Sequence, residues 1–480
     1  MEDAPLILWF RRDLRLDDHP MLQAALHSGR PIIPVFIYDP QTAVLGAAPR
    51  WRLGQGLEVF AAALAKLGSR LILRRGDALG CLTDLIAQTG AAGVYWQRMY
   101  DPASTARDAA IKSELRARGL IAQSHAGALL IEPWLVQTGQ GGPYRVYSPF
   151  WRAVSGLDFG PALPAPTRLP TPQAWPATDR LADWGMGADM RRGADIVAQH
   201  ACIGEVNALA RLDEFIARKI DAYKEARDFV GQDASSGLSE NLAWGEIGPR
   251  RIWHASTAPL QLGARGAEHF RKELVWREFA YHLMHHFPHI LHRNWREEWD
   301  DFPWAGDNPR AEAWRRGQTG EPFVDAAMRE VYVTGRVHNR ARMIVASYLT
   351  KHLLTDWRIG AAWFAEVLTD FDPASNAMGW QWVAGSGPDA APYFRVFNPS
   401  GQAEKFDSDG KYRRKWIAEG QSKAPKTALD FFDAVPQSWG LDSQGKYPAP
   451  IVDLAAGRAG ALAAYSAKGK KPAIMGDEIE

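Results

Sequence analysis

The sequence predicts a mixed fold in which a parallel α/β domain precedes an all-α domain. Three observations indicate this division. Short apolar runs alternate with Ala- and Leu-rich helical segments up to about Phe150, prolines crowd the stretch that follows, and helical periodicity without strand patterns fills the chain after about Glu205. The chain has 480 residues, of which 46% are hydrophobic, and a single core rarely grows past about 250–300 residues. We therefore expect an α/β domain over residues 1–135, a linker over 136–204 and a helical domain over 205–480.

The apolar runs of the first domain predict a doubly wound parallel sheet. Strands that are covered on both faces are almost continuously apolar, and the sequence has such runs at Leu6–Phe10, Ile32–Tyr38, Leu71–Leu73 and Gly93–Trp96. The stretch from Trp51 to Leu67 has the pattern of a covering helix. Ligands of such sheets bind at the carboxyl ends of the strands, so we expect a nucleotide-like molecule near Phe10–Arg12 or Tyr38–Pro40. No GxGxxG motif follows the first strand, which disfavours a dinucleotide-dependent dehydrogenase.

Proline and helical spacing define the remaining elements. An extended linker is predicted by prolines that neither a helix nor a sheet interior accommodates, namely Pro161, Pro164, Pro166, Pro170, Pro172 and Pro176. The helices expected in the second domain are Val206–Tyr223, Ala267–His286, Pro322–Thr334, Val337–Asp356 and Gly360–Thr369.

Composition limits the partners and the compartment. The formal charge of +1 argues against a general polyanion-coating protein, so nucleic-acid binding requires a local patch. Residues 336–358 contain five Lys or Arg and one acid, and residues 395–415 contain six and three. Cys81 and Cys202 lack metal-site spacing and suggest a reducing compartment. The histidines from His282 to His292 have no acidic or thiol companion set, so no metal site is expected. Without a basic leader or an apolar run near the roughly 20 residues of a membrane span, we expect a cytoplasmic protein that does not contact membranes.

The densest chemistry lies between residues 338 and 382. Cationic and amide groups at residues 338–343 can bind phosphates and a flavin, and Asp370 and Asp372 can orient a base or a ribityl chain. Trp380 and Trp382 can stack or carry electrons, although most of the twenty tryptophans must be structural. This combination predicts a redox site that faces nucleic acid.

A second group lies on one predicted helix face. Spacings of three and four bring together Glu273, Trp276 and Arg277, which are an acid, a stacking plane and a cation. On its own this pattern more often indicates a buried Trp276 beside a solvated Glu273–Arg277 ion pair.

Two further groups have a functional and a structural interpretation. Asn339, Arg342 and Met343 share a helix face, and Arg340 projects from its side toward a possible phosphate. Met343 alone more often fills a core. The hydroxyls and backbone amides of Ser235–Ser239 can hold a pyrophosphate, or they can cap a helix.

Five motifs occur together in this chain: Leu8-Trp9-Phe10-Arg11-Arg12-Asp13-Leu14-Arg15, Trp276-Arg277-Glu278-Phe279, Thr319-Gly320-Glu321-Pro322-Phe323-Val324-Asp325-Ala326-Ala327-Met328-Arg329, His338-Asn339-Arg340 and Gly379-Trp380-Gln381-Trp382. They resemble the photolyase/cryptochrome family, and the resemblance extends from about residue 6 to Tyr465. It implies an α/β antenna domain and a helical FAD-binding and DNA-binding domain. The implied activity is the blue-light-driven splitting of cyclobutane pyrimidine dimers in damaged DNA, by a protein that we expect to be a monomer.

The resemblance also implies roles for single residues. The implied FAD-binding positions are Tyr223, Ser235, Ser236, Leu238, Ser239, Arg277, Asn339, Arg342, Asp370, Asp372 and Asn376, with Asn376 beside flavin N5. The implied electron relay consists of Trp380, Trp357 and Trp304. The implied contacts to the lesion are Glu273, Trp276, Asn339, Met343 and Trp382, and those to flanking phosphates are Arg340, Arg395 and Lys405. A dimer has to leave the base stack to reach the flavin, and flipping costs least for a badly stacked step.

Two positions depart from the family pattern. The family often has an Arg where Gly237 stands and a Trp where Arg336 stands. The first departure puts a flavin phosphate contact in doubt, and the second a surface stacking contact near the lesion.

The branch of the family is indicated by shorter motifs. Tyr100-Asp101-Pro102-Ala103-Ser104, Leu130-Ile131-Glu132-Pro133-Trp134 and the ending near Ile474-Met475-Gly476 resemble plant cryptochromes and bacterial class III photolyases. That subgroup implies a 5,10-methenyltetrahydrofolate antenna, with a deazaflavin or a flavin as alternatives.

The choice between repair and signalling depends on three positions. Plant cryptochromes have an acid where Asn376 stands and lose the pair that corresponds to Glu273 and Trp276, whereas this chain keeps all three residues. We therefore expect repair. The alternatives are a cryptochrome-type blue-light receptor that binds FAD without repair, and a nucleic-acid binder with a vestigial site.

Overall fold

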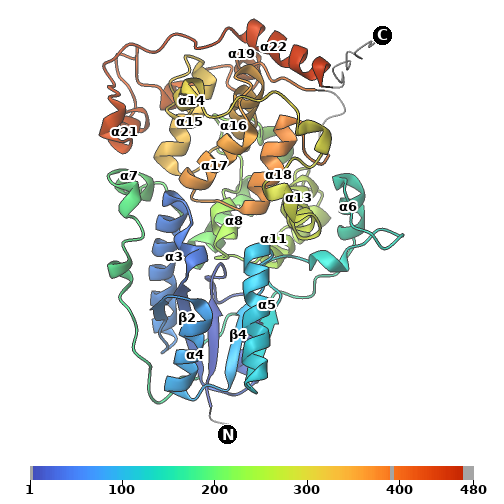
Figure 1. Cartoon of the computed structure of the whole chain (residues 1–480), viewed down its shortest axis with the longest axis vertical. Helices are drawn as coiled ribbons and strands as arrows, with labels where there is room; N and C mark the ends of the chain where they lie inside the picture. Colours follow the sequence, from blue (N-terminus) through green and yellow to red (C-terminus); the bar gives the residue numbers. More distant parts are fainter. Residues whose placement is uncertain (1–3, 390–393, 469–480) are drawn as a thin grey trace, which may run out of the picture.

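A parallel sheet with its covering helices occupies one end of the molecule, and helices alone build the other end (Figure 1). The structure is a computed structural model, and it describes residues 4–389 and 394–468. The Ile474-Met475-Gly476 motif lies outside the described residues. No helix of the described part is long and apolar enough to cross a membrane.

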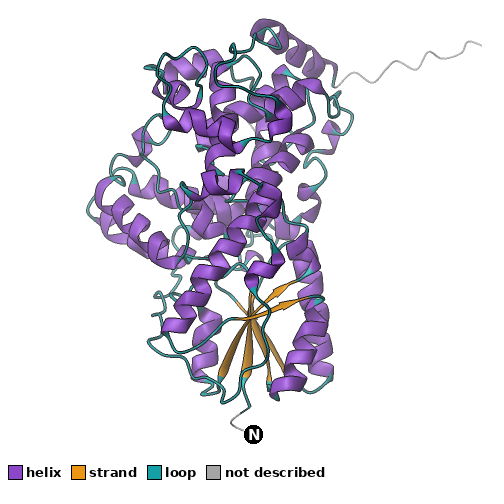
Figure 2. Cartoon of the chain, turned by 90° about the vertical axis from the view of Figure 1, so that its left-hand side faces the viewer, coloured by secondary structure: helices purple, strands orange, loops and turns teal. Residues whose placement is uncertain are grey.

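The sheet has the strand order β3-β2-β1-β4-β5, and every neighbouring pair is parallel. Its strands are β1 (Leu6–Phe10), β2 (Ile32–Tyr38), β3 (Ile72–Arg75), β4 (Gly93–Gln97) and β5 (Ile121–His125). The helices of this half are α1 (Pro20–His27), α2 (Pro40–Ala43), α3 (Ala47–Lys66), α4 (Ala78–Thr89) and α5 (Pro102–Ala117), and helices lie on both faces of the sheet (Figure 2). The doubly wound sheet is thus confirmed. Strand β5 was not predicted, because it is an edge strand in which exposed and buried residues alternate instead of forming an apolar run.

The proline-rich segment follows the outside of the sheet domain (Figure 1). It contains no helix or strand between Pro161 and Pro176, and backbone hydrogen bonds from Ile32 N to Pro170 O and from Asp18 N to Leu163 O, both 2.8 Å long, attach it to the sheet domain. The region predicted as linker also contains two helices, α6 (Tyr147–Val154) and α7 (Gly193–Ala198). Helix α6 packs on the helical domain, which becomes important for the site.

The helical domain is built around α13, which contacts α18, α6 and α9. Its helices are α8 (Glu205–Arg218), α9 (Tyr223–Ala226), α10 (Ser239–Ala243), α11 (Pro249–Ala255), α12 (Thr257–Gln261), α13 (Ala267–His286), α14 (Pro309–Arg315), α15 (Pro322–Thr334), α16 (Asn339–Ser347), α17 (Trp357–Val367), α18 (Pro373–Ala384), α19 (Pro399–Phe406), α20 (Lys411–Trp416), α21 (Lys426–Ala434) and α22 (Leu454–Ala467).

Two helix predictions require correction. The segment predicted as one helix from Val206 to Tyr223 is interrupted after Arg218, before α9 begins. The helix predicted from Val337 to Asp356 ends as α16 and a π-helical turn, Tyr348–His352. The chain then turns at Leu354, whose φ is +48°, and α17 starts where Asp356 accepts a hydrogen bond from Arg358 N at 2.8 Å. The apolar periodicity of the sequence continues through this turn, so it did not indicate that one helix ends and another begins there.

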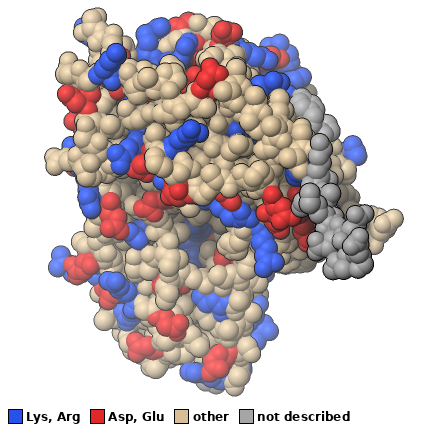
Figure 3. Space-filling view, turned by 45° about the horizontal axis from the view of Figure 1, so that its top comes forward, with Lys and Arg blue, Asp and Glu red and all other residues tan. Residues whose placement is uncertain are grey.

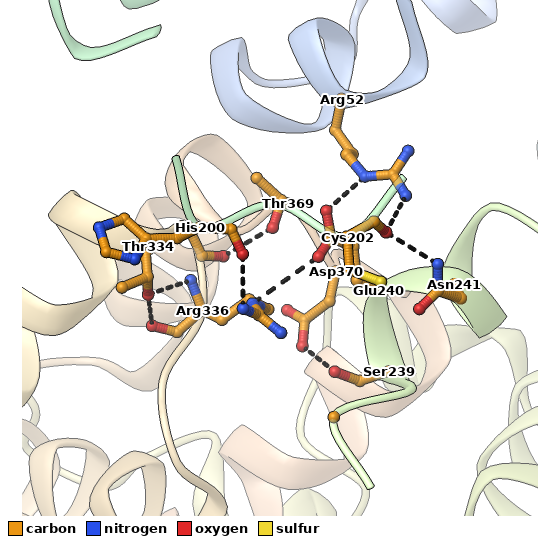
Figure 4. Close-up of polar contacts among 12 residues, drawn as sticks. Arg52, His200, Cys202, Ser239, Glu240, Asn241, Thr334, Arg336, Thr369 and Asp370 are labelled. Carbon is orange, nitrogen blue, oxygen red and sulfur yellow. Dashed lines mark hydrogen bonds and ion pairs between the residues drawn. The ribbon is translucent and has the colours of Figure 1, made fainter. Parts of the chain in front are cut away.

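The two domains are joined by polar contacts as well as by packing. Trp244, before α11, is buried in the core of the sheet domain, and its Nε1 donates to Thr369 O at 2.7 Å. Arg52 of α3 crosses the boundary to the carboxylate of Glu240 (Figure 4) and also binds the carboxylate of Glu246. These contacts fix α10 and the segment before α18 relative to each other, and both carry residues of the candidate site.

Candidate functional site

Two buried acids form the floor of the site. Asp370 is 6% exposed and Asp372 is 9% exposed. Asp370 Oδ2 accepts hydrogen bonds from Ser239 Oγ at 2.7 Å and from Arg342 Nη2 at 2.6 Å (Figure 4 shows the former). Asp372 caps α18 by accepting from Ser375 N at 2.8 Å. The buried Oδ1 of Asp370 has no hydrogen-bond partner among the described residues, so it can receive a donor from a ligand.

Helix α13 supplies a cation and a hydroxyl to the same floor. Arg277 Nη1 donates to Ala128 O at 2.9 Å and pairs with Glu278 at 3.2 Å. Tyr281, one turn further on, donates to Asp372 Oδ2 at 2.5 Å, and the guanidinium of Arg277 lies 4.9 Å from its ring centre. Burial raises the pKa of Glu278 to about 7 against the opposing effect of Arg277. The pairing of α13 with α18 thus positions Arg277 and Asp372 together.

The remaining predicted flavin residues surround this floor. Asn376 on α18 donates from Nδ2 to Ala361 O at 3.0 Å, which fixes the orientation of its amide. Ser235 is exposed and Ser236 half-buried, whereas Tyr223 and Leu238 are buried. The hydroxyls of this loop therefore remain available to a ligand, while Leu238 and Tyr223 pack into the core below.

The predicted lesion residues of α13 lie on the next face of the same helix. Glu273 forms an ion pair with Arg227, and a second, longer contact of 3.7 Å with His269. The ring of Trp276 stacks on Tyr147 of α6, with 3.6 Å between the ring centres and 7° between the planes. Trp276 is therefore not a core residue beside a solvated Glu273–Arg277 pair, because the ion-pair partner of Glu273 is Arg227.

The predicted phosphate contacts share one hollow. Arg340, Arg395 and Lys405 line a cavity of about 420 Å³ together with Asp228 and aromatic residues. Arg340 lies 2.5 Å from Asp228. Figure 3 shows one face of the molecule, which has a hollow with Lys and Arg side chains around it and acidic side chains among them. The structure thus brings these three cations together although they are up to 65 positions apart in the sequence.

The other predicted lesion residues lie at the edges of this region. Asn339 is the first residue of α16 and is exposed, and Met343 follows one turn later and is half-buried against the core of the helical domain. Trp382 is half-buried, and its Nε1 donates to Asp389 O at 3.1 Å. This hydrogen bond fixes the indole at the C-terminal end of α18.

The three tryptophans that were predicted to form the electron relay lie on or next to α17 and α18. Trp380 is buried against α17, where a Cβ added to Gly360 would lie 2.1 Å from its ring. Trp357 starts α17, on the same helix face as Gly360, and donates from Nε1 to Asn294 Oδ1 at 2.9 Å. Trp304 is half-buried, and its neighbour Ala305 forms a β-bridge with Thr355, two residues before Trp357. Trp380 and Trp357 are thus buried, and Trp304 is half-buried.

The first predicted cationic patch, residues 336–358, is not a surface patch. Arg342 points to Asp370, Arg358 pairs with Asp356 at 2.8 Å, and Lys351 is only 1% exposed. Burial lowers the pKa of Lys351 well below its usual value. The positions of these cations along the helices place them on different helix faces. Among the cations of this stretch that the structure describes, Arg340 lines the cavity.

Position 336 also differs from the expectation of a surface stacking contact near the lesion. Arg336 Nη2 donates to His200 O at 2.8 Å, and its Nε lies 3.7 Å from the buried carboxylate of Glu240 (Figure 4). The side chain therefore belongs to the polar network beside Ser239 and Asp370.

Several residues that the sequence did not indicate hold the predicted ones in place. Arg227 binds Glu273, Tyr147 stacks on Trp276, and Tyr281 binds Asp372. Tyr147 lies in the region predicted as linker, so no sequence pattern linked it to α13. The i, i+4 spacing of Arg277 and Tyr281 is a signal that helix periodicity offered.

These residues fit flavin adenine dinucleotide. The unpartnered Asp370 Oδ1 and the hydroxyls of the Ser235–Ser239 loop can bind its polar groups, and Arg277 and Arg342 supply cations next to them. The α/β domain is thus joined to a helical domain that contains buried acids with arginine, serine and tyrosine donors and a cavity lined by three cations.

Comparison with known proteins identifies the family of this chain. The family model DNA photolyase matches residues 6–171, and the FAD binding domain of DNA photolyase matches residues 270–467. A deoxyribodipyrimidine photo-lyase of Agrobacterium fabrum is 46% identical over 97% of this chain and 98% of its own length. Cryptochrome-2 of Arabidopsis thaliana is 34% identical over 94% of this chain and 77% of its own length. The crystal structure of a class III photolyase from Agrobacterium tumefaciens superimposes with a TM-score of 0.90 at 45% identity, covering 98% of this chain and 99% of that one. The chain belongs to the photolyase/cryptochrome family.

Proposed function

We propose that this protein is a light-driven DNA repair enzyme that splits cyclobutane pyrimidine dimers. The observation that carries the proposal is the meeting of two sites on α13. Arg277 lies against Tyr281, which binds Asp372 of the flavin site, and Glu273 and Trp276, at neighbouring positions of the same helix, contact Arg227 and Tyr147. A relative named deoxyribodipyrimidine photo-lyase matches the chain over nearly its whole length.

The chain's own residues have separate tasks in this reaction. FAD, when bound in its reduced state and excited by light, supplies the electron that opens the dimer. Trp276 and Trp382 offer apolar walls for a flipped dimer, and Glu273 hydrogen-bonds the pyrimidine edge and stabilises charge that develops on it. Arg340, Arg395 and Lys405 bind the phosphates on either side. Asn376 holds its amide toward the flavin, and Trp380, Trp357 and Trp304 conduct an electron inward when the flavin must be reduced.

The antenna, the oligomeric state and the compartment belong to the same proposal. The motifs Tyr100–Ser104 and Leu130–Trp134 favour 5,10-methenyltetrahydrofolate as the antenna chromophore. We propose a monomer, because one chain carries every residue assigned to the site. The free thiols of Cys81 and Cys202 are in keeping with a reducing cytoplasm.

The proposal is tested by illuminating the chemically reduced protein with a thymine-dimer oligonucleotide and following the restored thymine absorbance. We expect restoration under blue light and none in the dark, and an absorption band of the antenna beside that of the flavin. Bound FAD without restoration would instead support a cryptochrome-type receptor.

A further inference from the structure

The loop that precedes α10 has no side chain at its centre. Gly237 lies between Ser236 and Leu238 with φ of +64°, a backbone conformation that favours glycine. The two serines before it leave hydroxyls available, and Ser239 binds Asp370. The loop therefore provides small donors but no charge of its own.

A guanidinium from α8 lies within van der Waals contact of the position where a side chain of residue 237 would begin. A Cβ added to Gly237 would be 3.4 Å from Nη1, 3.5 Å from Cδ and 3.6 Å from Cζ of Arg211. Arg211 Nη1 donates to Gly237 O at 2.6 Å, and this is its one hydrogen bond within residues 4–389 and 394–468. A guanidinium has five N–H donors in a planar fork that matches phosphate oxygens, so most of this donor set remains for a ligand.

A second guanidinium is close enough to repel the first. Arg336 is the largest charge influence on Arg211 and, after burial, lowers its pKa. Arg336 Nε lies 3.7 Å from Glu240 Oε2, and neither atom has a hydrogen bond among the described residues, whereas Arg52 binds Glu240 Oε1 and Glu246.

The neighbourhood has an unmatched positive charge. Three guanidiniums, of Arg52, Arg211 and Arg336, meet the two carboxylates of Glu240 and Glu246, which leaves an excess of one. The other charges nearby form their own pairs: Arg342 with Asp370, and Lys219 with Asp233. Like charges side by side in a partly buried place are unfavourable unless an anion joins them.

We propose that Arg211 binds the pyrophosphate of FAD and supplies the charge that the Ser235–Ser239 loop lacks at Gly237. Arg336 is a positioning residue in this arrangement, because it keeps the Arg211 guanidinium turned toward the loop by repulsion. The inference rests on the proposed flavin site and adds to it a residue from α8, a helix that carries none of the other assigned contacts.

The test is FAD affinity of the full-length protein after removal and re-addition of FAD, measured by quenching of flavin fluorescence at several salt concentrations. Arg211→Gln should weaken FAD binding by about tenfold or more, the usual effect of a lost hydrogen bond to a charged group. It should also make affinity less dependent on salt, which loss of packing alone would not do. Arg218→Gln is the matched control, since Arg218 is an exposed arginine at the end of the same helix, and it should bind FAD as the parent does.

A rescue variant uses the geometry of the glycine. In the Arg211→Gln background, Gly237→Arg places a guanidinium in the vacated volume and should recover part of the affinity, although its positive φ limits the gain. Unchanged affinity and salt dependence in Arg211→Gln would overturn the inference. Should that variant fail to fold, as judged by the circular dichroism of the apoprotein, Arg211→Met, which keeps an unbranched side chain without the charge, decides the matter: weaker binding supports the inference, and parent-like binding overturns it. A parent protein that binds no FAD would contradict the proposed function instead.

Discussion

The flavin side and the DNA side that we propose for the helical domain differ in the burial of their charged groups. On the flavin side, Asp370 and Asp372 are buried, and serine, tyrosine and arginine donors hold them in place. On the DNA side, Arg395 and Lys405 are exposed around a cavity. Buried acids with fixed partners select one small molecule in one orientation, whereas exposed cations attract any phosphate backbone.

Helices α13 and α16 connect the two sides. Helix α16 places Arg342 on Asp370 and Arg340 on Asp228, and helix α13 places Arg277 beside Tyr281 and Glu273, one turn earlier, on Arg227. Variants on the two sides should therefore change different measured properties of the protein.

We expect the largest effect from Trp380→Phe, a change on the flavin side. This change should abolish photoreduction of oxidised flavin, because the relay loses its innermost residue. Repair by protein that has been reduced chemically should be spared. Absorption spectra during illumination measure the first effect and single-turnover repair the second. Photoreduction at the parent rate would show that electrons reach the flavin by another route.

On the DNA side, Trp276→Ala should weaken dark binding of dimer-containing duplex by about 10- to 100-fold, because a stacking plane is worth about 1–3 kcal/mol per base. Affinity for undamaged duplex should change little. Trp134→Ala is a suitable control, since Trp134 is an exposed tryptophan that contacts the end of α13. Competition binding with both duplexes gives the answer, and an equal loss for both would contradict a lesion-stacking role.

Helix α16 contributes residues to both sides, and we expect the group at its start to lower the free energy of unfolding at acid pH. Burial lowers the pKa of His338 to about 4, and its Nδ1 accepts a hydrogen bond from Arg340 N at 3.1 Å. Because the unfolded chain takes up this proton near pH 6.5, the stabilisation is present above that pH and is lost as the pH falls toward 4, by up to about 3 kcal/mol.

The variant His338→Asn keeps a capping acceptor and removes the titration. Urea unfolding at pH 7.5 and pH 4.5 should show the parent losing more free energy of unfolding than the variant. A difference between the two proteins that stays constant with pH would exclude His338 as the cause.

We expect the smallest effects from changes in the cavity that Arg340, Arg395 and Lys405 line. Arg340→Ala should weaken binding to damaged and undamaged duplex alike and reduce the salt dependence by about one phosphate contact. Asp228→Asn should act in the opposite direction by about 1 kcal/mol or less, since it frees Arg340 from its ion pair. Arg358→Ala, in the same stretch of sequence but outside the cavity, should leave both quantities unchanged. A loss confined to damaged duplex would contradict a phosphate role for Arg340.

Much of the fold could be predicted because burial on two faces leaves a plain signal. Strands β1, β2 and β4 are continuous apolar runs, and α13 and α15 have helical periodicity from end to end. The edge strand β5 lacks such a run. The turn at Leu354 has no Gly or Pro to mark it, so the interruption between α16 and α17 required tertiary structure to be seen.

Sequence motifs indicated which residues of the candidate site lie near one another. Counting charged residues along the sequence did not indicate where the cations lie in the structure. The motif residues converge on α13, α16 and α18, whereas the cations of residues 336–358 scatter into ion pairs and the core. Tyr147 and Arg211 are contributed by α6 and α8, far from the motifs. Contacts between distant elements leave no local pattern, so neither residue could be found from the sequence.

The most direct test of the two-sided site is single-turnover repair of a thymine-dimer oligonucleotide under blue light, with Glu273→Ala and Trp380→Phe each reduced chemically beforehand. The flavin is then reduced in both variants, so the assay reports on the lesion pocket alone. We predict that Trp380→Phe repairs as the parent does and that Glu273→Ala loses most of its repair yield while retaining FAD. Parent-like repair by Glu273→Ala would place the lesion elsewhere and contradict the assignment of α13 to both sides.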